Sequence, residues 1–236
     1  MKATDIFKNK KFIECLKYNT YDDKDNYIKI FDDNNEIIEE NVKKVTKIDC
    51  PGYWITNIDD ISIFINLEKL YLNYNNIKEL PKEIGNLKNL KELYLGNNQI
   101  QKLQKEIFQL ENLKELYLVD NWIKEIPKEI WNLKNLEELY LNNNNLQWLP
   151  IEILKLSKLK WLSLKKAFDL DNLKLKPEEL FYILEQLKEK NLFSNLSLDY
   201  LEEEVYPILA EKIKKKYKIT DLKQIKDNLN LDNLNF

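Results

Sequence analysis

The chain has 236 residues, and its 37 basic and 40 acidic side chains give a net charge of −3. This balance argues against a dedicated nucleic-acid binder. The chain contains three widely separated glycines and no histidine. This composition excludes a glycine-rich phosphate loop, a histidine-based catalytic pair and a mixed cysteine and histidine zinc site. We therefore expect a non-catalytic protein that needs no cofactor and no metal ion.

The cysteines and the first residues of the chain bear on its compartment. Cys15 and Cys50 are too few for a disulfide framework, so we predict two reduced, partly buried thiols. Residues 1–17 mix lysines with acidic residues and lack the apolar stretch of a signal peptide. No segment reaches eighteen consecutive apolar residues. We expect a cytoplasmic protein that does not bind a membrane, and secretion by a signal-independent route stays open.

Residues 1–44 are predicted to form a region that caps the rest of the chain. Thr4 can cap a helix, a polar turn is expected at residues 22–26, and a strand at residues 27–31. The apolar side of this helix would consist of Ile6, Phe12, Ile13 and Leu16.

Residues 45–166 contain a repeated pattern. Each regular copy reads L-x-x-L-x-L-x-x-N-x-L, with isoleucine as the last apolar residue in three copies. A proline follows later in each copy except the second, where Gln104 replaces it. Self-similarity at a fixed period is the signature of a solenoid. The copies begin at intervals of 23 residues, at Leu67, Leu90, Leu113, Leu136 and, in part, Leu159.

This pattern resembles the leucine-rich repeat family, in the 23-residue type found in many bacterial proteins. The resemblance is strong over residues 67–156 and weak in the flanks. It implies an α/β fold: a right-handed solenoid with a parallel β-sheet on its concave face and short helical or 3₁₀ returns outside. It also implies binding of a protein, but it does not identify the partner.

The residues alone favour the same architecture. Leu70 and Leu72 are two positions apart, so both point to one side of a strand while Tyr71 points to the other. An asparagine follows each strand and is predicted to be buried, because its amide can bond backbone groups where the chain turns. These asparagines are Asn75, Asn98, Asn121 and Asn144.

The pattern decays at both ends, as expected where terminal coils need a different cover. A degenerate first coil begins at Val45, with Cys50 pointing inward and Tyr53 in place of the asparagine. A partial last coil begins at Leu159 and ends where Ala167 replaces the asparagine.

Residues 167–236 are expected to form a helical C-terminal cap region. A proline at position 177 suits a first helical turn, and one at position 207 would kink a helix. We predict helices at residues 177–190, 199–216 and 220–229, and a frayed end at residues 228–236.

The outward strand positions carry a row of tyrosines beside a row of glutamates. Tyrosine offers a large contact area together with a hydroxyl group, so we predict that a protein partner binds this concave face. The alternative, that tyrosine is only repeat consensus chosen for strand propensity and stacking, stays open. The predicted contacts are Tyr71, Tyr94, Tyr117 and Tyr140 with Glu92, Glu115 and Glu138.

Departures from the repeat extend this predicted site. Exposed tryptophan often marks a partner surface, and Trp122, Trp148 and Trp161 occur near the edges of the later coils. Val119 interrupts the asparagines of the neighbouring coils beside Trp122. We predict that these four residues border the site.

The preferred hypothesis is therefore a monomeric, non-catalytic module that binds a protein. One alternative is a secreted or host-directed bacterial effector. Another is a structural scaffold that binds through its C-terminal helices or its outer face, near Phe108 and Trp131. Both of those aromatic rings are predicted to pack against adjacent coils. The lysines at residues 212–218 are interpreted as a solvated helix end.

Overall fold

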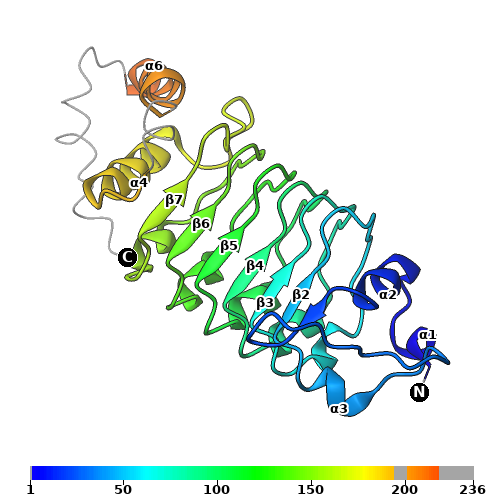
Figure 1. Ribbon diagram of the computed structural model, residues 1–236. Helices are drawn as coiled ribbons and strands as arrows, with labels where there is room; N and C mark the ends of the chain where they lie inside the picture. The colour runs from blue at the N-terminus through cyan, green and yellow to red at the C-terminus, as the bar shows by residue number, and fades with distance from the viewer. Residues whose placement is uncertain (1, 194–200, 218–236) are drawn as a thin grey trace.

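The computed structural model describes residues 2–193 and 201–217. Its central part is a solenoid in which each coil adds one short strand to a single sheet, in sequence order (Figure 1). The strands are β1 Thr20–Tyr21, β2 Lys47–Asp49, β3 Lys69–Tyr71, β4 Glu92–Tyr94, β5 Glu115–Tyr117, β6 Glu138–Tyr140 and β7 Trp161–Ser163.

The register of the sheet follows the 23-residue repeat. Strands β2 to β7 are parallel, and the middle residue of each strand pairs with the middle residue of the next, as Leu93 does with Leu116. Both leucines are fully buried, whereas their neighbours Tyr94 and Tyr117 are partly exposed. Side chains alternate along a strand, so every regular coil directs leucine inward and tyrosine outward. The predicted solenoid is confirmed.

The chain returns along the outer face through short 3₁₀ helices. A proline precedes three of the five, and its fixed φ suits the entry into a helical turn. Each of these helices buries at least one isoleucine against the sheet. Their bounds are Ile61–Ile63, Lys82–Asn86, Lys105–Gln109, Lys128–Asn132 and Ile151–Lys155.

The repeated asparagines form a buried ladder. Asn98 accepts a hydrogen bond from the Ile77 amide at 3.0 Å and donates to the carbonyls of Leu72 and Leu95 at 2.9 and 3.0 Å. It therefore joins backbone groups of its own coil to those of the coil before. The asparagines at the same position in the other regular coils make equivalent bonds and are also buried. The predicted structural role of these residues is confirmed.

The N-terminal cap differs from its prediction. Two helices, α1 Ala3–Ile6 and α2 Lys10–Leu16, replace the single helix expected after Thr4. Asn9 separates them, because its side chain accepts hydrogen bonds from the first amides of α2, at 2.9 and 3.1 Å. A third short helix, α3, spans Glu39–Val42.

The predicted strand at residues 27–31 is also wrong. These residues make only isolated bridges, and the strand that joins the sheet is β1, antiparallel to β2. The polar turn between them is confirmed: Asp22 accepts a hydrogen bond from the Asn26 amide at 2.8 Å. This turn brings Tyr27 beside Tyr21 of β1, but their pairing is a single isolated bridge, so residues 27–31 form no strand.

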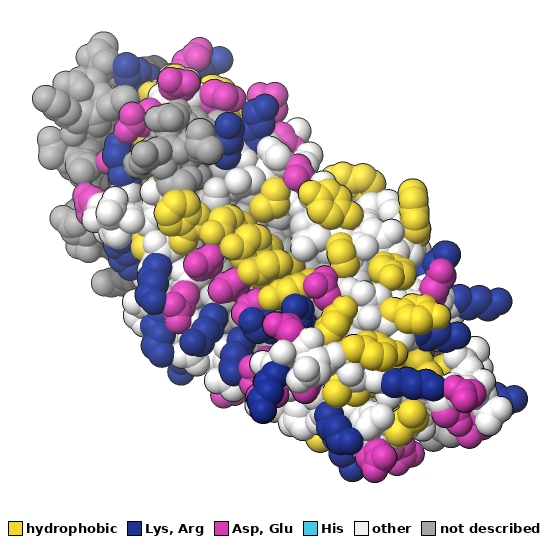
Figure 2. Space-filling view, viewed as in Figure 1, with side chains coloured by type: hydrophobic (Ala, Val, Ile, Leu, Met, Phe, Trp, Pro, Cys, Tyr) yellow, Lys and Arg dark blue, Asp and Glu magenta, His cyan; other side chains and the backbone are white. Residues whose placement is uncertain are grey.

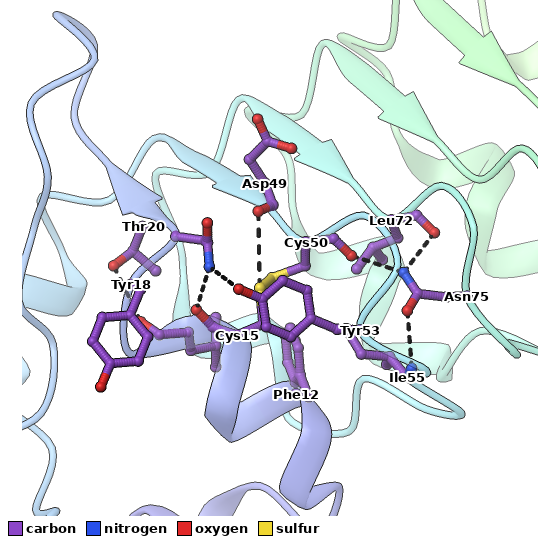
Figure 3. Close-up of a disulfide and its surroundings, with 12 residues drawn as sticks. Phe12, Cys15, Tyr18, Thr20, Asp49, Cys50, Tyr53, Ile55, Leu72 and Asn75 are labelled. Atoms are coloured by element: carbon purple, nitrogen blue, oxygen red, sulfur yellow. Dashed lines mark hydrogen bonds between the residues drawn. A yellow bond between two sulfur atoms is a disulfide. The ribbon is translucent and has the colours of Figure 1, made fainter.

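Cys15 and Cys50 form a disulfide, which corrects the prediction of two reduced thiols (Figure 3). Their Cα atoms are 5.8 Å apart, within the range that a disulfide requires. Helix α2 lies against the end of β2, so Cys15 meets Cys50, which points inward as predicted; both are fully buried. The bond ties the N-terminal cap to the first coil.

The C-terminal region is helical, as predicted. Helix α4, Pro177–Glu189, packs on the last 3₁₀ helix and on α6, Tyr206–Tyr217. A π-helical turn, Leu201–Val205, leads into α6 just before the expected kink at Pro207. The helix predicted at residues 220–229 and the frayed end lie outside the described residues. None of the described helices is long and apolar enough to span a membrane.

Candidate functional site: the concave face

Four tyrosines form a stacked ladder across the sheet. The ring centroids of Tyr71 and Tyr94 are 4.6 Å apart, those of Tyr94 and Tyr117 are 4.1 Å apart, and those of Tyr117 and Tyr140 are 4.0 Å apart. Figure 2 shows a continuous band of hydrophobic-class side chains along this face, with acidic side chains beside it. Each inner ring lies between two neighbouring rings, which are stacked in the outer pairs and tilted by 40° in the middle pair, so the ladder presents mainly ring edges and hydroxyl groups.

The phenols are bonded to the glutamates beside them. Tyr94 donates a hydrogen bond to Glu115, one coil further on, and Tyr71 bonds Glu92 in the same way. Glu138 accepts two such bonds, from Tyr117 at 3.2 Å and from Tyr140 at 2.9 Å. These bonds hold the rings and carboxylates in fixed positions, so binding would order few further side chains.

Burial raises the pKa of Tyr71 and Tyr94 well above the usual value of a phenol. Their hydrogen bonds to carboxylates raise it further, because the neutral phenol is the donor. Burial also raises the pKa of Tyr117 and Tyr140. All four side chains are therefore neutral at physiological pH and serve as donors.

Charge is distributed unevenly along the face. Lys69 lies 2.9 Å from Glu92, so this carboxylate is paired. Within the described residues no lysine lies within 4.0 Å of Glu115 or Glu138. The later coils thus present two ordered carboxylates that form no ion pair with a described lysine.

The predicted bordering residues occupy different places. Trp161 lies on the concave face in β7, in register with Glu138, and is 40% exposed. Trp122 follows the buried Asn121 and is 49% exposed, and Val119 lies two residues beyond Tyr117, after the end of β5. Trp148 instead lines hollows with residues of the outer 3₁₀ helices and of α4. The structure therefore does not group Trp148 with the tyrosines.

The sequence also matches a known family. The sequence model of the family described as leucine rich repeat matches residues 55–100, 65–123, 88–146 and 111–166. Residues 55–166 therefore belong to the leucine-rich repeat family. No match was found among curated proteins.

Two solved bacterial structures are similar to this leucine-rich repeat protein. A leucine-rich repeat protein of Leptospira interrogans is 39% identical with a TM-score of 0.52, over 54% of this chain and 33% of that one. This chain thus spans a third of the Leptospira protein. Internalin C2 of Listeria monocytogenes is 23% identical with a TM-score of 0.58, over 73% of this chain and 74% of that one. The second likeness concerns the fold alone. Leucine-rich repeat proteins are generally protein-interaction modules.

Two exposed aromatic residues of the repeats were missed by the sequence analysis. Trp54 is 69% exposed and Tyr74 is 66% exposed, and both have a left-handed backbone, with φ of +62° and +60°. Tyr74 occupies a position that is left-handed in the later coils too, where Asn97 and Asn143 stand. Asparagine tolerates this conformation far better than tyrosine. This departure from the repeat was the signal that could have revealed Tyr74.

One prediction about the outer face, that the Trp131 ring packs against an adjacent coil, needs correction. Phe108 is buried, as predicted, but Trp131 at the same repeat position is 41% exposed. Indole is too large for a short 3₁₀ return to cover, and Lys134 lies 5.8 Å from the ring centroid instead.

In the described part of the chain no three Cys, Asp or Glu side chains are grouped to hold a metal ion.

Proposed function

We propose that this chain is a monomeric, non-catalytic interaction module that binds a protein partner on its concave face. The observation that carries the proposal is the ordered tyrosine ladder beside Glu115 and Glu138, two carboxylates that form no ion pair with a described lysine. A basic or amphipathic partner surface suits this arrangement, since complementary charge sets specificity and association rate.

The size of the ladder fits such a partner. Neighbouring strands lie about 4.8 Å apart, so the three steps from Tyr71 to Tyr140 span roughly 15 Å. An extended segment or a helix of the partner could lie across it. Tyrosine is among the residues in which binding energy is concentrated.

The experiment begins with affinity capture from lysates of the protein's own cells. Binding of the captured partner is then compared for two variants. The triple variant Tyr94→Ala, Tyr117→Ala, Tyr140→Ala should abolish binding, and Tyr117→Ala alone should weaken it by about 1–3 kcal/mol. Trp131→Ala on the outer face is the matched control and should bind normally. Loss of binding in folded Trp131→Ala, with normal binding by the triple variant, would favour the scaffold alternative.

The carboxylates give a second measurement on the same partner. Glu115→Gln and Glu138→Gln should slow association and reduce the dependence of the rate on salt, because they remove the unpaired charge. Glu92→Gln is the control, since Lys69 already neutralises Glu92.

A specific observation favours the exported alternative. Disulfides persist in oxidising compartments and are rare in the cytosol, and Cys15 is bonded to Cys50. This supports an extracytoplasmic site of action over the cytoplasmic prediction. Alkylation of the denatured protein, after an acid quench of intact cells and without a reductant, tests the point. Protection of both cysteines in the denatured protein supports export, whereas their complete alkylation supports a cytoplasmic location.

A further inference from the structure

We propose that the partner inserts an arginine side chain at the C-terminal end of the tyrosine ladder, where the guanidinium stacks between Tyr140 and Trp161 and pairs with Glu138. This inference rests on the proposed function, because it specifies how the concave face holds its partner. It goes beyond that function in naming one anchoring residue type and its subsite.

The opposite end of the ladder shows the same chemistry within the chain itself. The first ring, Tyr71, has no tyrosine before it, since its strand neighbour is Asp49. Lys47 occupies this end instead, with its Nζ 5.7 Å from the Tyr71 ring centroid and 5.4 Å from that of Tyr21. Cations are attracted to aromatic rings at such distances. The N-terminal end of the ladder is therefore closed by a cation of the chain.

In the part of the chain that the structure describes, the C-terminal end of the ladder has no such closure. The strand neighbour of Tyr140 is Ser163, whose short side chain provides no ring to continue the stack. Among the described residues no lysine stands over the ring of Tyr140 or Trp161. Within the described residues, Tyr140 thus has a ring on one side only, that of Tyr117, and no cation like the one found at Tyr71.

The third component is the carboxylate of Glu138. It accepts hydrogen bonds from Tyr117 and Tyr140, and a carboxylate has about four acceptor positions, so positions remain for another donor. Trp161 is the strand neighbour of Glu138. Strand spacing and rise place the Cα atoms of Trp161 and Tyr140 about 8 Å apart, close enough for both rings to contact one inserted side chain.

Arginine suits these three groups better than lysine. Its planar guanidinium can stack on an aromatic ring while its N–H groups form two parallel bonds to a carboxylate. A lysine ammonium is more strongly hydrated and offers a point charge. An acidic or purely apolar side chain would leave the Glu138 carboxylate without a counter-charge.

The test uses N-acetyl-arginine amide as the probe and the full chain as the receptor. Indole N–H signals in a nitrogen-15 NMR spectrum report on each tryptophan, and Trp161→Phe identifies the Trp161 signal. We expect a saturable shift of that signal and none for Trp122. The lysine amide should bind several-fold more weakly. The citrulline amide, which keeps the shape of arginine without its charge, should bind at least tenfold more weakly.

Two variants locate the contact. Glu138→Gln should weaken the arginine probe at least fivefold, and Tyr140→Leu should do likewise with unchanged dispersion of the spectrum. Glu92→Gln, at the end closed by Lys69 and Lys47, is the matched control and should bind the probe as the parent does. Equal affinity for the arginine and citrulline amides, or an unchanged affinity in Glu138→Gln, overturns the proposal.

The test of the arginine anchor can fail while the proposed function of the concave face still holds. If the arginine amide does not shift Trp161 while partner binding still requires Tyr94 and Tyr117, the anchor is wrong and the concave-face function stands. If partner binding does not require Tyr94 and Tyr117, both proposals fall.

Discussion

The side-chain oxygen of Asn121 accepts a hydrogen bond from the backbone amide of Ile100, 2.9 Å away in the preceding coil. The side-chain nitrogen of Asn121 donates to the carbonyls of Leu95 at 2.9 Å and Leu118 at 3.3 Å. One amide thus satisfies backbone groups of two coils at a turn from which water is excluded. The stability of the solenoid depends on such residues as well as on its leucines.

Asn121→Ala should lower the free energy of unfolding by about 1–3 kcal/mol, because it leaves buried amide and carbonyl groups without partners. Asn112→Ala is the matched control. Asn112 is exposed and makes a single bond, to the Lys88 carbonyl, so its loss should cost less than about 1 kcal/mol. Denaturant unfolding of both variants measures the difference. Equal costs would contradict the role assigned to the buried asparagine.

Leu116→Ala should cost about 2–5 kcal/mol, because the side chain is fully buried between neighbouring coils. Leu116→Asp should be worse, since it buries an unpaired charge. Lys114→Ala, two residues earlier and exposed, controls for substitution in the same coil. A soluble Leu116→Asp variant with the parent's thermal midpoint would show that the assigned strand register is wrong.

The disulfide should contribute about 3–4 kcal/mol, because it closes a loop between residues separated by 35 positions. Cys15→Ala, Cys50→Ala removes it without introducing a polar group. Guanidinium unfolding at equilibrium, with and without a reductant, measures the effect. The reductant should lower the midpoint of the parent only, and a midpoint that does not change on verified reduction would contradict this contribution.

The sequence predicted side-chain positions best in the repeats, where several copies carry the same pattern. The inward leucines, the asparagine ladder and the outward tyrosines were all predicted, because four copies share one register. The N-terminal region has no repeat, so its helix boundary depended on one side chain, Asn9. The pairing of Cys15 with Cys50 depended on the path of the chain between them. The domain boundaries at residues 44/45 and 166/167 stay predictions.

The candidate site was predicted only in part. The rows of tyrosine and glutamate follow from strand alternation, but the bond from Tyr94 to Glu115 depends on the stagger of adjacent coils. The exposure of Trp131 depends on how much of a large ring its neighbours can cover. Neither property is visible in a pattern of apolar and polar residues.

The raised pKa values of the ladder tyrosines predict lower stability in alkali. The folded chain retains the Tyr94 proton above pH 10, whereas the unfolded chain releases it near the usual phenol pKa of about 10. The stability that the Tyr94 phenol contributes is therefore complete below the pKa of the unfolded chain, about 10. It is lost as the pH rises through the higher pKa of the folded chain. Unfolding at pH 8–11 should show a smaller alkaline decline in Tyr94→Phe. Between pH 7 and 9 the difference between the two proteins should be constant, and parallel curves up to pH 11 would contradict the shift.

Tyr74→Asn should stabilise the fold. Tyr74 has a left-handed backbone, with φ of +60°, and its ring is 66% exposed, so the substitution relieves strain and removes little packing. Asn97 and Asn143 already adopt this conformation at the same repeat position. We expect a gain of up to about 1 kcal/mol in the free energy of unfolding.

Asn97→Tyr is the reciprocal control for Tyr74→Asn, and it should lose a similar amount of stability. A stability gain accompanied by weaker partner binding would show that the strained tyrosine is kept as a contact, since bulky residues in this conformation persist mainly at functional positions. A loss of stability in Tyr74→Asn would mean that the exposed ring makes a compensating contact, and the strain argument would then be wrong.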